Sequence, residues 1–398
     1  PTQTASWDDF DGDGWLDLFI GNETGPNESH PCELFHNQGD GTFVDIAQQT
    51  PRLGKGQSPQ NMALEGYIKG VAFGDYDEDG RPDLFVSRID GPNLLLRNNG
   101  PTSGGRWSFQ DVSQEAGITA PFRSFPAWWF DYNNDGHLDI FVSGFRYSSS
   151  GWVAQDYLGM DNKGVKARLY RGHGNGSFDD VTASMHLDHV FLTMGCNFGD
   201  LDEDGWLDMY LSTGEPDFQA LYPNRMLRNN GGQGFQDVTT STRMGHLQKG
   251  HGIAFSDFDN DGDQDIYAVM GGAFSGDVFP NALFENPGHD RHSLVLRLEG
   301  VRSHRSAIGT LVRVDIEEKE GTKRTIYSRV GTGGSFGSAT LRREIGLANA
   351  QSILNVTLSW PSGTTQELGP LDLDSWWKVR EGEPPTPLFS PPDQIKEG

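Results

Sequence analysis

The stretch FGDYDEDGRPDLFVS, residues 73–87, places five acidic residues directly before an apolar run. Like charges this close repel one another and raise one another's pKa values, so a positive ion is expected among them. Four side chains stand at positions 1, 3, 5 and 9 of a loop: Asp75, Asp77, Asp79 and Asp83. Gly80 at position 6 suits a sharp turn that requires positive φ, and the carbonyl of Arg81 at position 7 can join the converging oxygens. The stretch therefore predicts a cation site.

Carboxylate and carbonyl oxygens in a flexible loop favour calcium over magnesium or zinc. The loop opens like an EF-hand, but Asp83 leads directly into an apolar strand instead of a loop that ends in Glu at position 12 and continues as a helix. A single copy could be a solvated turn. The pattern occurs five times, however, each time with Gly at position 6, and this predicts about five bound Ca²⁺ ions.

We number these copies acidic loops 1 to 5 in chain order. Their predicted ligands occupy positions 1, 3, 5, 7 and 9, with position 7 acting through its carbonyl: Asp9, Asp11, Asp13, Trp15 and Asp17; Asp75, Asp77, Asp79, Arg81 and Asp83; Asp131, Asn133, Asp135, His137 and Asp139; Asp200, Asp202, Asp204, Trp206 and Asp208; Asp257, Asp259, Asp261, Asp263 and Asp265. Loop 3 has one charge fewer because of Asn133, so we expect it to bind calcium most weakly.

Composition limits the possible partners. The formal charge is −25, and five calcium ions would reduce it to about −15, which still disfavours nucleic acids and anionic membrane surfaces. No apolar run approaches the roughly 20 residues of a transmembrane helix. The two cysteines, Cys32 and Cys196, are expected to be unpaired thiols rather than a disulfide.

The location of the protein is predicted from its calcium loops. Loops of this type suit the millimolar calcium found outside cells, so we expect an extracellular, periplasmic or cell-surface protein. The sequence begins only a few residues before acidic loop 1 and within an expected strand, which indicates a processed or truncated N-terminus.

Each acidic loop belongs to a longer repeat. An aromatic residue precedes the first Asp by two positions in every copy, and apolar or small residues precede it by four, an alternation that predicts a half-buried strand. A second strand follows each loop, and an Asn/Gly-rich centre between apolar flanks then predicts a hairpin. One repeat thus holds about four strands, with no convincing helical period before residue 290. Tandem units of this kind predict propeller blades, whereas the competing parallel β-helix has far shorter repeats.

The units of the form FxDxDxDGxxDLFV resemble FG-GAP/VCBS repeats, similar to those of integrin α-chain propellers, over residues 1–290. Residues 291–380 lack acidic loops, and SHRSAIGTLVRV, GTGGSFGSA and LSWPSGTTQEL resemble the ASPIC/UnbV domain that follows such repeats in cartilage acidic protein and many bacterial secreted proteins. An Asn commonly expected near His304 is absent. Residues 381–398 are a Pro-rich tail.

The resemblance implies an all-β fold, a calcium-binding β-propeller. We favour seven blades, the last ones contributed by residues after 290. Five or six blades beside a separate β-sandwich remain the alternative.

No phosphate loop, nucleophile elbow or zinc-type spacing is present, and GTGGSFG (331–337) is expected to be a turn. Carboxylates that coordinate calcium stay ionised and cannot easily act as acids. Positions that differ between repeats are free for function, and the residues at the start of the innermost strands should ring one end of the channel or merely plug it. Together with one variable loop they give the candidate ligand-binding residues Lys69, Arg123, Lys249, His251 and Glu215.

Two functions from different classes remain open. The first is an extracellular recognition or adhesion scaffold for a glycan or protein, and four basic candidates in an acidic chain would favour an acidic glycan. The insertion at 144–164, with its aromatic residues, is a second candidate surface. The alternative is a propeller enzyme, a lyase, hydrolase or cyclase, with its site at the channel mouth. Propellers host both classes, so whether the chain is an enzyme stays uncertain at this point.

Overall fold

The computed structural model describes residues 2–25, 27–55, 58–147, 150–218, 220–272 and 274–388. The described chain is nearly all β, with one short α-helix, α1 (Ser150–Tyr157), in the insertion where no helix was expected. Both cysteines are buried and unpaired, as predicted. Residues 389–398 of the predicted Pro-rich tail lie outside the described residues.

Five sheets consist of consecutive strands, and each begins with an inner strand that leads into an acidic loop. We call them blades 1 to 5. Blade 1 contains β1 (Thr2–Asp8), β2 (Asp17–Asn22), β3 (Glu33–Asn37) and β4 (Phe43–Asp45). Blade 2 contains β7 (Ile68–Gly74), β8 (Asp83–Arg88), β9 (Leu94–Pro101) and β10 (Trp107–Asp111), extended outward by β5 (Pro51–Gly54) and β6 (Gln60–Asn61). Blade 3 contains β11 (Ser124–Phe130), β12 (Asp139–Gly144), β13 (Arg168–Gly172) and β14 (Phe178–Asp180).

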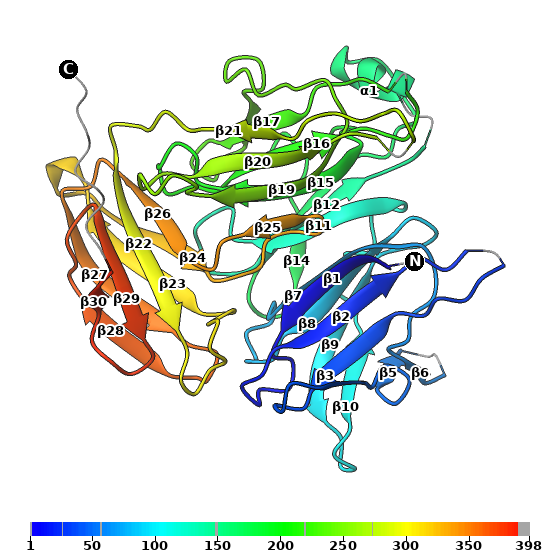
Figure 1. Cartoon of the computed structure of the whole chain (residues 1–398), viewed down its shortest axis with the longest axis horizontal. Coiled ribbons are helices and arrows are strands. Elements are labelled where there is room, and N and C mark those ends of the chain that lie inside the picture. The colour runs from blue at the N-terminus through cyan, green and yellow to red at the C-terminus, as the bar shows by residue number, and fades with distance from the viewer. Residues whose placement is uncertain are drawn as a thin grey trace.

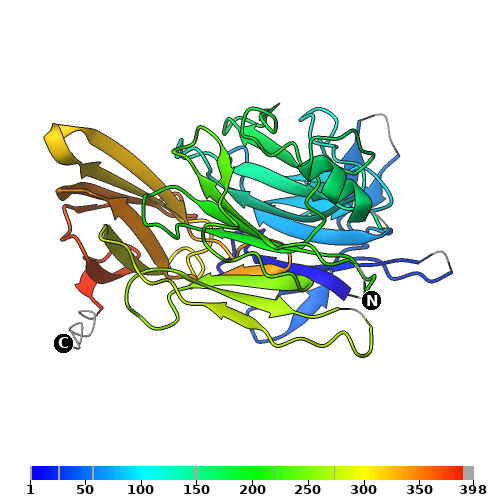
Figure 2. The same ribbon diagram turned by 90° about the horizontal axis from the view of Figure 1, so that it is seen from above.

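Blade 4 contains β15 (Thr193–Gly199), β16 (Asp208–Thr213), β17 (Arg225–Asn229) and β18 (Phe235–Asp237). Blade 5 contains β19 (Gly250–Ser256), β20 (Asp265–Met270) and β21 (Ala282–Phe284). The inner strands of consecutive blades lie side by side, as the radial arrangement in Figures 1 and 2 shows. The all-β class and the propeller type predicted from the repeats are therefore confirmed.

The burial of each inner strand follows from the position of its blade in the series of blades 1 to 5. Every residue of β11, in the central blade, is buried, because blades on both sides cover it. In β1, at the end of the row, buried and exposed residues alternate, and Trp7 is 40% exposed. The half-buried alternation expected for all copies thus holds at the edge and gives way to full burial in the middle.

The chain after residue 290 forms two further sheets. One contains β22 (His292–Glu299), β26 (Arg343–Ala348), β29 (Ser375–Arg380) and β30 (Thr386–Pro387), and the other β23 (Leu311–Glu317), β24 (Lys323–Arg329), β27 (Ser352–Ser359) and β28 (Thr365–Gly369). The short 3₁₀ helix η1 (Lys319–Gly321) connects β23 to β24. Residues of both sheets pack into a single hydrophobic core, so the two sheets form a sandwich at the side of the blades (Figure 2).

The structure therefore differs from the favoured count of seven blades and matches the alternative of five blades beside a separate β-sandwich. The buried core of these two sheets contains no blade residue, whereas each of the cores along blades 1 to 5 joins two successive blades. An open groove separates blade 1 from blade 5, and the sandwich forms its third wall, lined by Trp15 and Leu16, Ser256 and Asp257, and Leu298.

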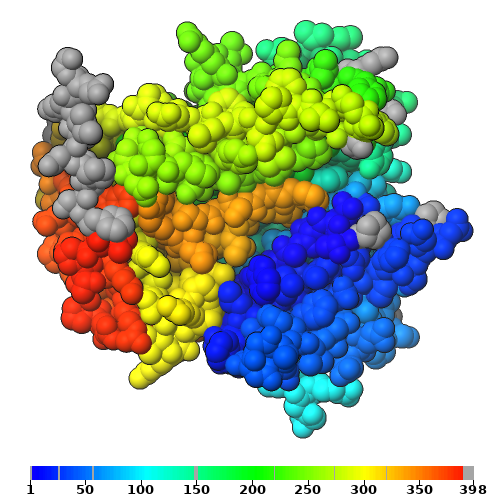
Figure 3. Space-filling view, viewed as in Figure 1, coloured from blue at the N-terminus to red at the C-terminus, as the bar shows by residue number. Residues whose placement is uncertain are grey.

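The segment 331–339 of the sandwich fills the channel between the inner strands. The backbone amide and the hydroxyl of Ser335 both donate to the carbonyl of Ala127 in blade 3, at 3.1 and 2.8 Å. The carbonyl of Ser338 accepts from Asn197 Nδ2 of blade 4 at 2.6 Å, and β25 (Gly337–Ala339) pairs in parallel with β19 of blade 5. Figure 3 shows this orange segment between blade 5 and the blue blade 1. The stretch expected to be a turn is thus the filling of the channel.

An asparagine in or just after the third strand joins neighbouring blades. Asn229 Nδ2 of blade 4 donates to the carbonyl of Tyr132 in acidic loop 3 at 2.8 Å, and Asn98 and Asn286 make the same bond to Phe10 and Leu201 in the preceding blade. Blade 3 has Gly172 here, because a Cβ would lie only 2.2 Å from the carbonyl of Leu138. We call this bond the asparagine clamp.

Replacing Asn229 with Ala is expected to destabilise the protein by about 1–3 kcal/mol, because the buried carbonyl of Tyr132 loses its donor. The matched control is Asn37→Ala, since the Asn37 amide donates only to Leu16 within its own blade. Chemical denaturation in calcium buffer measures both variants. Equal losses of unfolding free energy in the two variants would show that the asparagine clamp between blades adds nothing to stability.

Candidate metal centres

The five acidic loops share one backbone geometry. The carboxylate at position 1 accepts the amides of positions 5 and 6, as Asp9 does from Asp13 at 3.0 Å and from Gly14 at 2.9 Å. The glycine at position 6 has positive φ in every loop, as predicted. Position 4, which the sequence did not single out, is also left-handed in every loop. The repeated turn explains why the side chains of positions 1, 3 and 5 point inward.

The carboxylate at position 9 is fixed by two strands. In blade 1, Asp17 Oδ2 accepts the amide of Phe10 at 3.3 Å and Oδ1 accepts the amide of Asn37, at the end of β3, at 2.9 Å. The equivalent pairs occur in all five blades. Position 9 also begins the second strand of its blade, so the strand order of the blade places the last carboxylate of the loop.

The predicted ligands converge in four of the five loops. Three side chains in each of loops 1, 2, 4 and 5 offer ligand atoms that lie within 4.8 Å of one another. Among the described residues, loop 3 has no such trio of carboxylate or imidazole groups, because Asn133 replaces a carboxylate. Asp263, at position 7 of loop 5, is almost fully buried.

Buried oxygens without a hydrogen bond mark the centre of three loops. In these three loops the oxygen is at position 3: Oδ1 of Asp77, Asn133 and Asp202; in loop 5 it is Asp263 Oδ1 at position 7. Asp202 Oδ1 lies 3.2 Å from Arg291 Nη1, but without hydrogen-bond geometry. A buried acceptor without a donor is costly, and a hard cation supplies the missing partner. The donor set consists of oxygens and fits calcium.

Burial raises the pKa values of the ligand carboxylates. Desolvation is the largest cause, and neighbouring carboxylates add to it, so that the pKa of Asp9, Asp75 and Asp257 is about 6 and that of Asp131 about 7. Without calcium, these carboxylates therefore ionise less readily in the folded protein than they would in water.

This shift predicts an inverse pH dependence for protein stripped of calcium on a chelating resin. The folded pKa values lie above the unfolded value of about 3.9, so the folded state binds more protons between pH 4 and 7 and loses stability as the pH rises. The melting temperature should be higher at pH 5 than at pH 7.5. With saturating calcium the order should reverse, because protons then compete with the ion. A stripped protein that gains stability toward pH 7.5 would contradict the expectation.

Acidic loop 1 differs from the others by an imidazole. His36 Nδ1 lies 3.2 Å from Asp17 Oδ1 and 3.4 Å from Asp11 Oδ2, within ligand distance of the same centre. Blade 4 has Arg228 at this place, 2.6 Å from Asp202 Oδ2. The sequence reasoning missed His36 because it lies on the third strand, 19 residues after Asp17, although its place directly before Asn37, which aligns with the clamp asparagines of other blades, could have indicated it.

The candidate ligand-binding residues lie at the opposite end of the blades from the acidic loops. Lys69 Nζ pairs with Glu23 of blade 1 and lies 4.9 Å from the ring centroid of Phe125. Lys249 is buried and pairs with Asp277 at 2.9 Å. Each lysine thus has an acidic partner from a loop that the repeat alignment did not place beside it, so no isolated basic funnel forms there.

Two of the remaining three candidates have partners of their own within the fold. His251 Nε2 lies 2.8 Å from the carbonyl of Gly271, and the buried Glu215 accepts the hydroxyl of Tyr222 at 3.1 Å. Arg123 is exposed and has positive φ. Whether any of the five binds a ligand stays a prediction.

The sandwich rests on the acidic loops, which the sequence could not reveal. Arg324 Nη1 donates to the carbonyl of Asp204 at 2.9 Å, and Arg342 lies 3.2 Å from Asp257 Oδ2. The amide of Tyr327 donates to Asn134 Oδ1 at 2.9 Å. Loops 3, 4 and 5 therefore form part of the interface between the blades and the sandwich.

Comparison with known proteins gives two family matches. Residues 9–86 and 75–142 match the FG-GAP-like repeat, and residues 300–386 match the ASPIC and UnbV domain. Cartilage acidic protein 1 of Mus musculus is 31% identical over 239 residues, 59% of this chain and 32% of the relative. The Homo sapiens protein of the same name is 31% identical over 239 residues, 59% of this chain and 31% of the relative. The chain spans about a third of the length of these relatives.

Among solved structures, a chain from the cryo-EM structure of RAG in complex with one melted RSS and one unmelted RSS superposes with a TM-score of 0.36. It is 12% identical, and the match covers 82% of this chain and 95% of that chain. This likeness is too low to support an argument.

Proposed function

Because the chain contains FG-GAP-like repeats followed by an ASPIC and UnbV domain, we propose that it is a calcium-stabilised β-propeller that acts as a recognition or adhesion scaffold for a glycan or protein outside the cell. The calcium part is supported by the converging carboxylates and by the buried position 3 oxygens that lack a hydrogen bond. An extracellular, periplasmic or surface location supplies the millimolar calcium that such loops need.

The observation that carries the recognition function is an exposed apolar surface at the end of blades 4 and 5 opposite the acidic loops. We call it the apical patch, and it consists of Phe218, Leu247, Phe274, Val278 and Phe279. The rings of Phe218 and Phe274 stack at 5.6 Å, and the buried Lys249 and Asp277 lie beneath them. Contiguous exposed apolar side chains of this kind are typical of binding surfaces.

The contacts of the candidate ligand-binding residues favour a binding scaffold over an enzyme. Lys69, Lys249 and Glu215 each hold a partner within the fold. No helix in the described part of the chain has the length and apolarity that a membrane crossing requires. The proposed partner is a glycan or an extracellular protein.

The calcium part predicts five ions per chain in calcium-saturated buffer, with loop 3 the weakest site. Asn133→Asp restores the missing carboxylate and should tighten the weakest site by roughly tenfold, because ligand charge sets the affinity of calcium loops. Calorimetric titration of stripped protein measures both. Two or fewer ions per chain would overturn the assignment.

The recognition part is tested by binding of the calcium-loaded chain to a glycan array and to immobilised matrix proteins. The double variant Phe218→Ser, Phe274→Ser should abolish binding, whereas Phe43→Ser, an exposed ring of blade 1, should not. Unchanged binding by the double variant would move the site away from the apical patch and toward the 144–164 insertion.

A further inference from the structure

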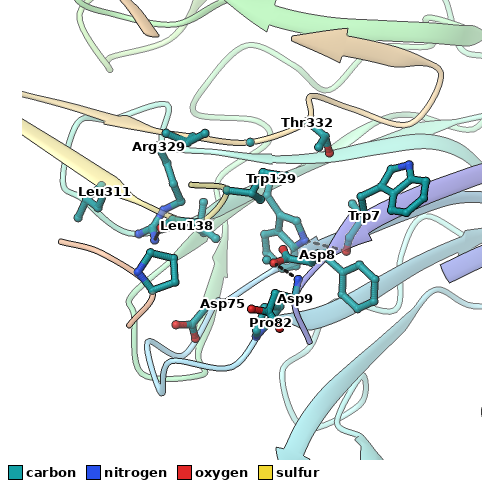
Figure 4. Close-up of a pocket in the computed structure, with 18 of the residues that line it drawn as sticks. Trp7, Asp8, Asp9, Asp75, Pro82, Trp129, Leu138, Leu311, Arg329 and Thr332 are labelled. Carbon is teal, nitrogen blue, oxygen red and sulfur yellow. Dashed lines mark hydrogen bonds between the residues drawn. The ribbon is translucent and has the colours of Figure 1, made fainter. Parts of the chain in front are cut away.

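A cavity of about 160 Å³ lies where blades 1 to 3 meet the sandwich. The blades contribute the buried carboxylate of Asp8, the position 1 residues of acidic loops 1 to 3 and the indole of Trp129, and the sandwich contributes Arg329 and Arg343. Figure 4 labels Asp8, Asp9, Asp75, Trp129 and Arg329. A single water molecule needs a cavity of about 10–15 Å³, so this cavity has room for a small molecule.

Three arginines line the cavity, Arg302, Arg329 and Arg343, and the guanidinium groups of Arg329 and Arg343 lack acidic partners among the described residues. Arg343 is only 5% exposed, and its one hydrogen bond runs from Nε to Ser328 Oγ at 3.0 Å. Arg329 donates to the carbonyls of Gly309 and Gly136 at 3.3 and 3.2 Å. Neither guanidinium has a carboxylate within 4.0 Å among the described residues.

Their lack of ion pairs contrasts with the neighbouring Arg342. The protein has 56 acidic and 31 basic side chains, so carboxylates are in excess. Arg342, next to Arg343, pairs with both Asp257 and Glu344. A buried guanidinium without an anion is costly, so the cavity is suited to receive one.

The acidic groups nearest to Arg329 are committed elsewhere. Asp75, Glu78 and Asp131 act on it electrostatically from a distance. Asp75 and Asp131 are position 1 ligands, and Glu78 lies 2.6 Å from His137 Nδ1. Calcium in loops 1 to 3 would offset six of the eleven ligand charges of these loops and would hold the position 1 carboxylates of the cavity wall, so the wall around Arg329 and Arg343 would become less negative.

We propose that this cavity binds a small hydroxylated anion, with its carboxylate or sulfate group held by Arg329 and Arg343. A guanidinium presents donors in a planar fork that matches an oxyanion. Figure 4 shows Asp8 across the cavity from Arg329, with Trp129 between them. Asp8 Oδ1 accepts the amide of Asp9, and the carboxylate can receive a hydroxyl of the ligand. The site rests on the proposed calcium loading of loops 1 to 3 and is independent of the apical patch.

Calorimetric titration of the calcium-loaded full chain with glucuronate, sulfate and glucose, at constant ionic strength, tests the proposal. Glucuronate should bind, sulfate should compete with it, and glucose should do neither. Preference for sulfate alone would assign the site to sulfated ligands. No binding of either anion at millimolar concentration would overturn the proposal.

Variants locate the binding. Arg343→Met and Arg329→Met should each weaken glucuronate binding at least tenfold, whereas Arg313→Met, which removes an exposed arginine of the same sandwich, should leave it unchanged. If Arg343→Met does not fold, Arg343→Lys keeps the charge without the fork and should weaken binding by several fold. Equal affinity in all of these variants would show that the anion binds elsewhere.

Replacing calcium with La³⁺ separates this inference from the proposed function. The trivalent ion adds positive charge beside the cavity and should tighten glucuronate binding by several fold without loss of fold. An unchanged affinity would contradict the electrostatic coupling. The double variant Phe218→Ser, Phe274→Ser should bind glucuronate as tightly as the parent chain does. If the apical patch turned out not to bind a partner, this result would therefore be unchanged.

Discussion

Removal of calcium is expected to lower the melting temperature by ~10 °C or more. A site occupied at tenfold its Kd stabilises the native state by about 1.4 kcal/mol, so five sites give about 7 kcal/mol. The whole fold of a typical domain is stable by only about 5–15 kcal/mol. Without the ions, three or four carboxylates per loop face one another beside buried strands, and loops 3 to 5 also carry the sandwich.

Thermal denaturation followed by circular dichroism, in calcium and after chelation, measures this shift. Adding back calcium should restore the midpoint, and magnesium at the same concentration should not, because it demands a tighter octahedral shell. A midpoint that does not move after prolonged chelation, with metal analysis showing that the ions have left, would contradict a structural role for calcium.

Gly195→Ala is expected to have the largest effect of any single methyl group in the chain. A Cβ on Gly195 in β15 would lie 1.6 Å from the carbonyl oxygen of His251 in β19, so the inner strands of blades 4 and 5 would have to separate. Backbone atoms on both sides cannot relieve the clash by a rotamer change. We expect a loss of at least ~3 kcal/mol, because overpacking that shifts backbone exceeds the usual cost of an extra methylene.

Gly252→Ala on β19 is the matched control, since the nearest atom to its Cβ would lie at 3.6 Å, an ordinary contact distance. Urea denaturation in calcium buffer compares the two variants with the parent chain. Similar stabilities for Gly195→Ala and Gly252→Ala would mean that the strands are not as close as the structure places them.

The acidic loops were predictable because their chemistry is local. Positions 1 to 9 lie within nine residues, and one turn with a left-handed glycine suffices to bring the oxygens together. The same holds for the blade, whose first three strands follow one another directly and pair with their sequence neighbours. His36 was missed because its contact with Asp17 depends on how the third strand lies against the second.

The partners of the candidate ligand-binding residues could not be predicted. The repeat alignment correctly placed Lys69 and Lys249 near the start of inner strands, but Glu23 and Asp277 belong to variable loops that no repeat describes. Likewise, Arg329 and Arg343 lie on separate strands of the sandwich, and only the tertiary structure brings both to the wall of one cavity.

By itself the sequence determined the all-β class, the repeated blade and the acidic loops, because period-2 alternation and a nine-residue loop are set by neighbours along the chain. The tertiary structure alone decided the count of five blades, the sandwich, the filling of the channel by residues 331–339 and the cavity beside Arg329. These features join segments that lie far apart in the sequence, such as Ser335 and Ala127, and are fixed by which apolar faces remain to be covered once the blades have formed.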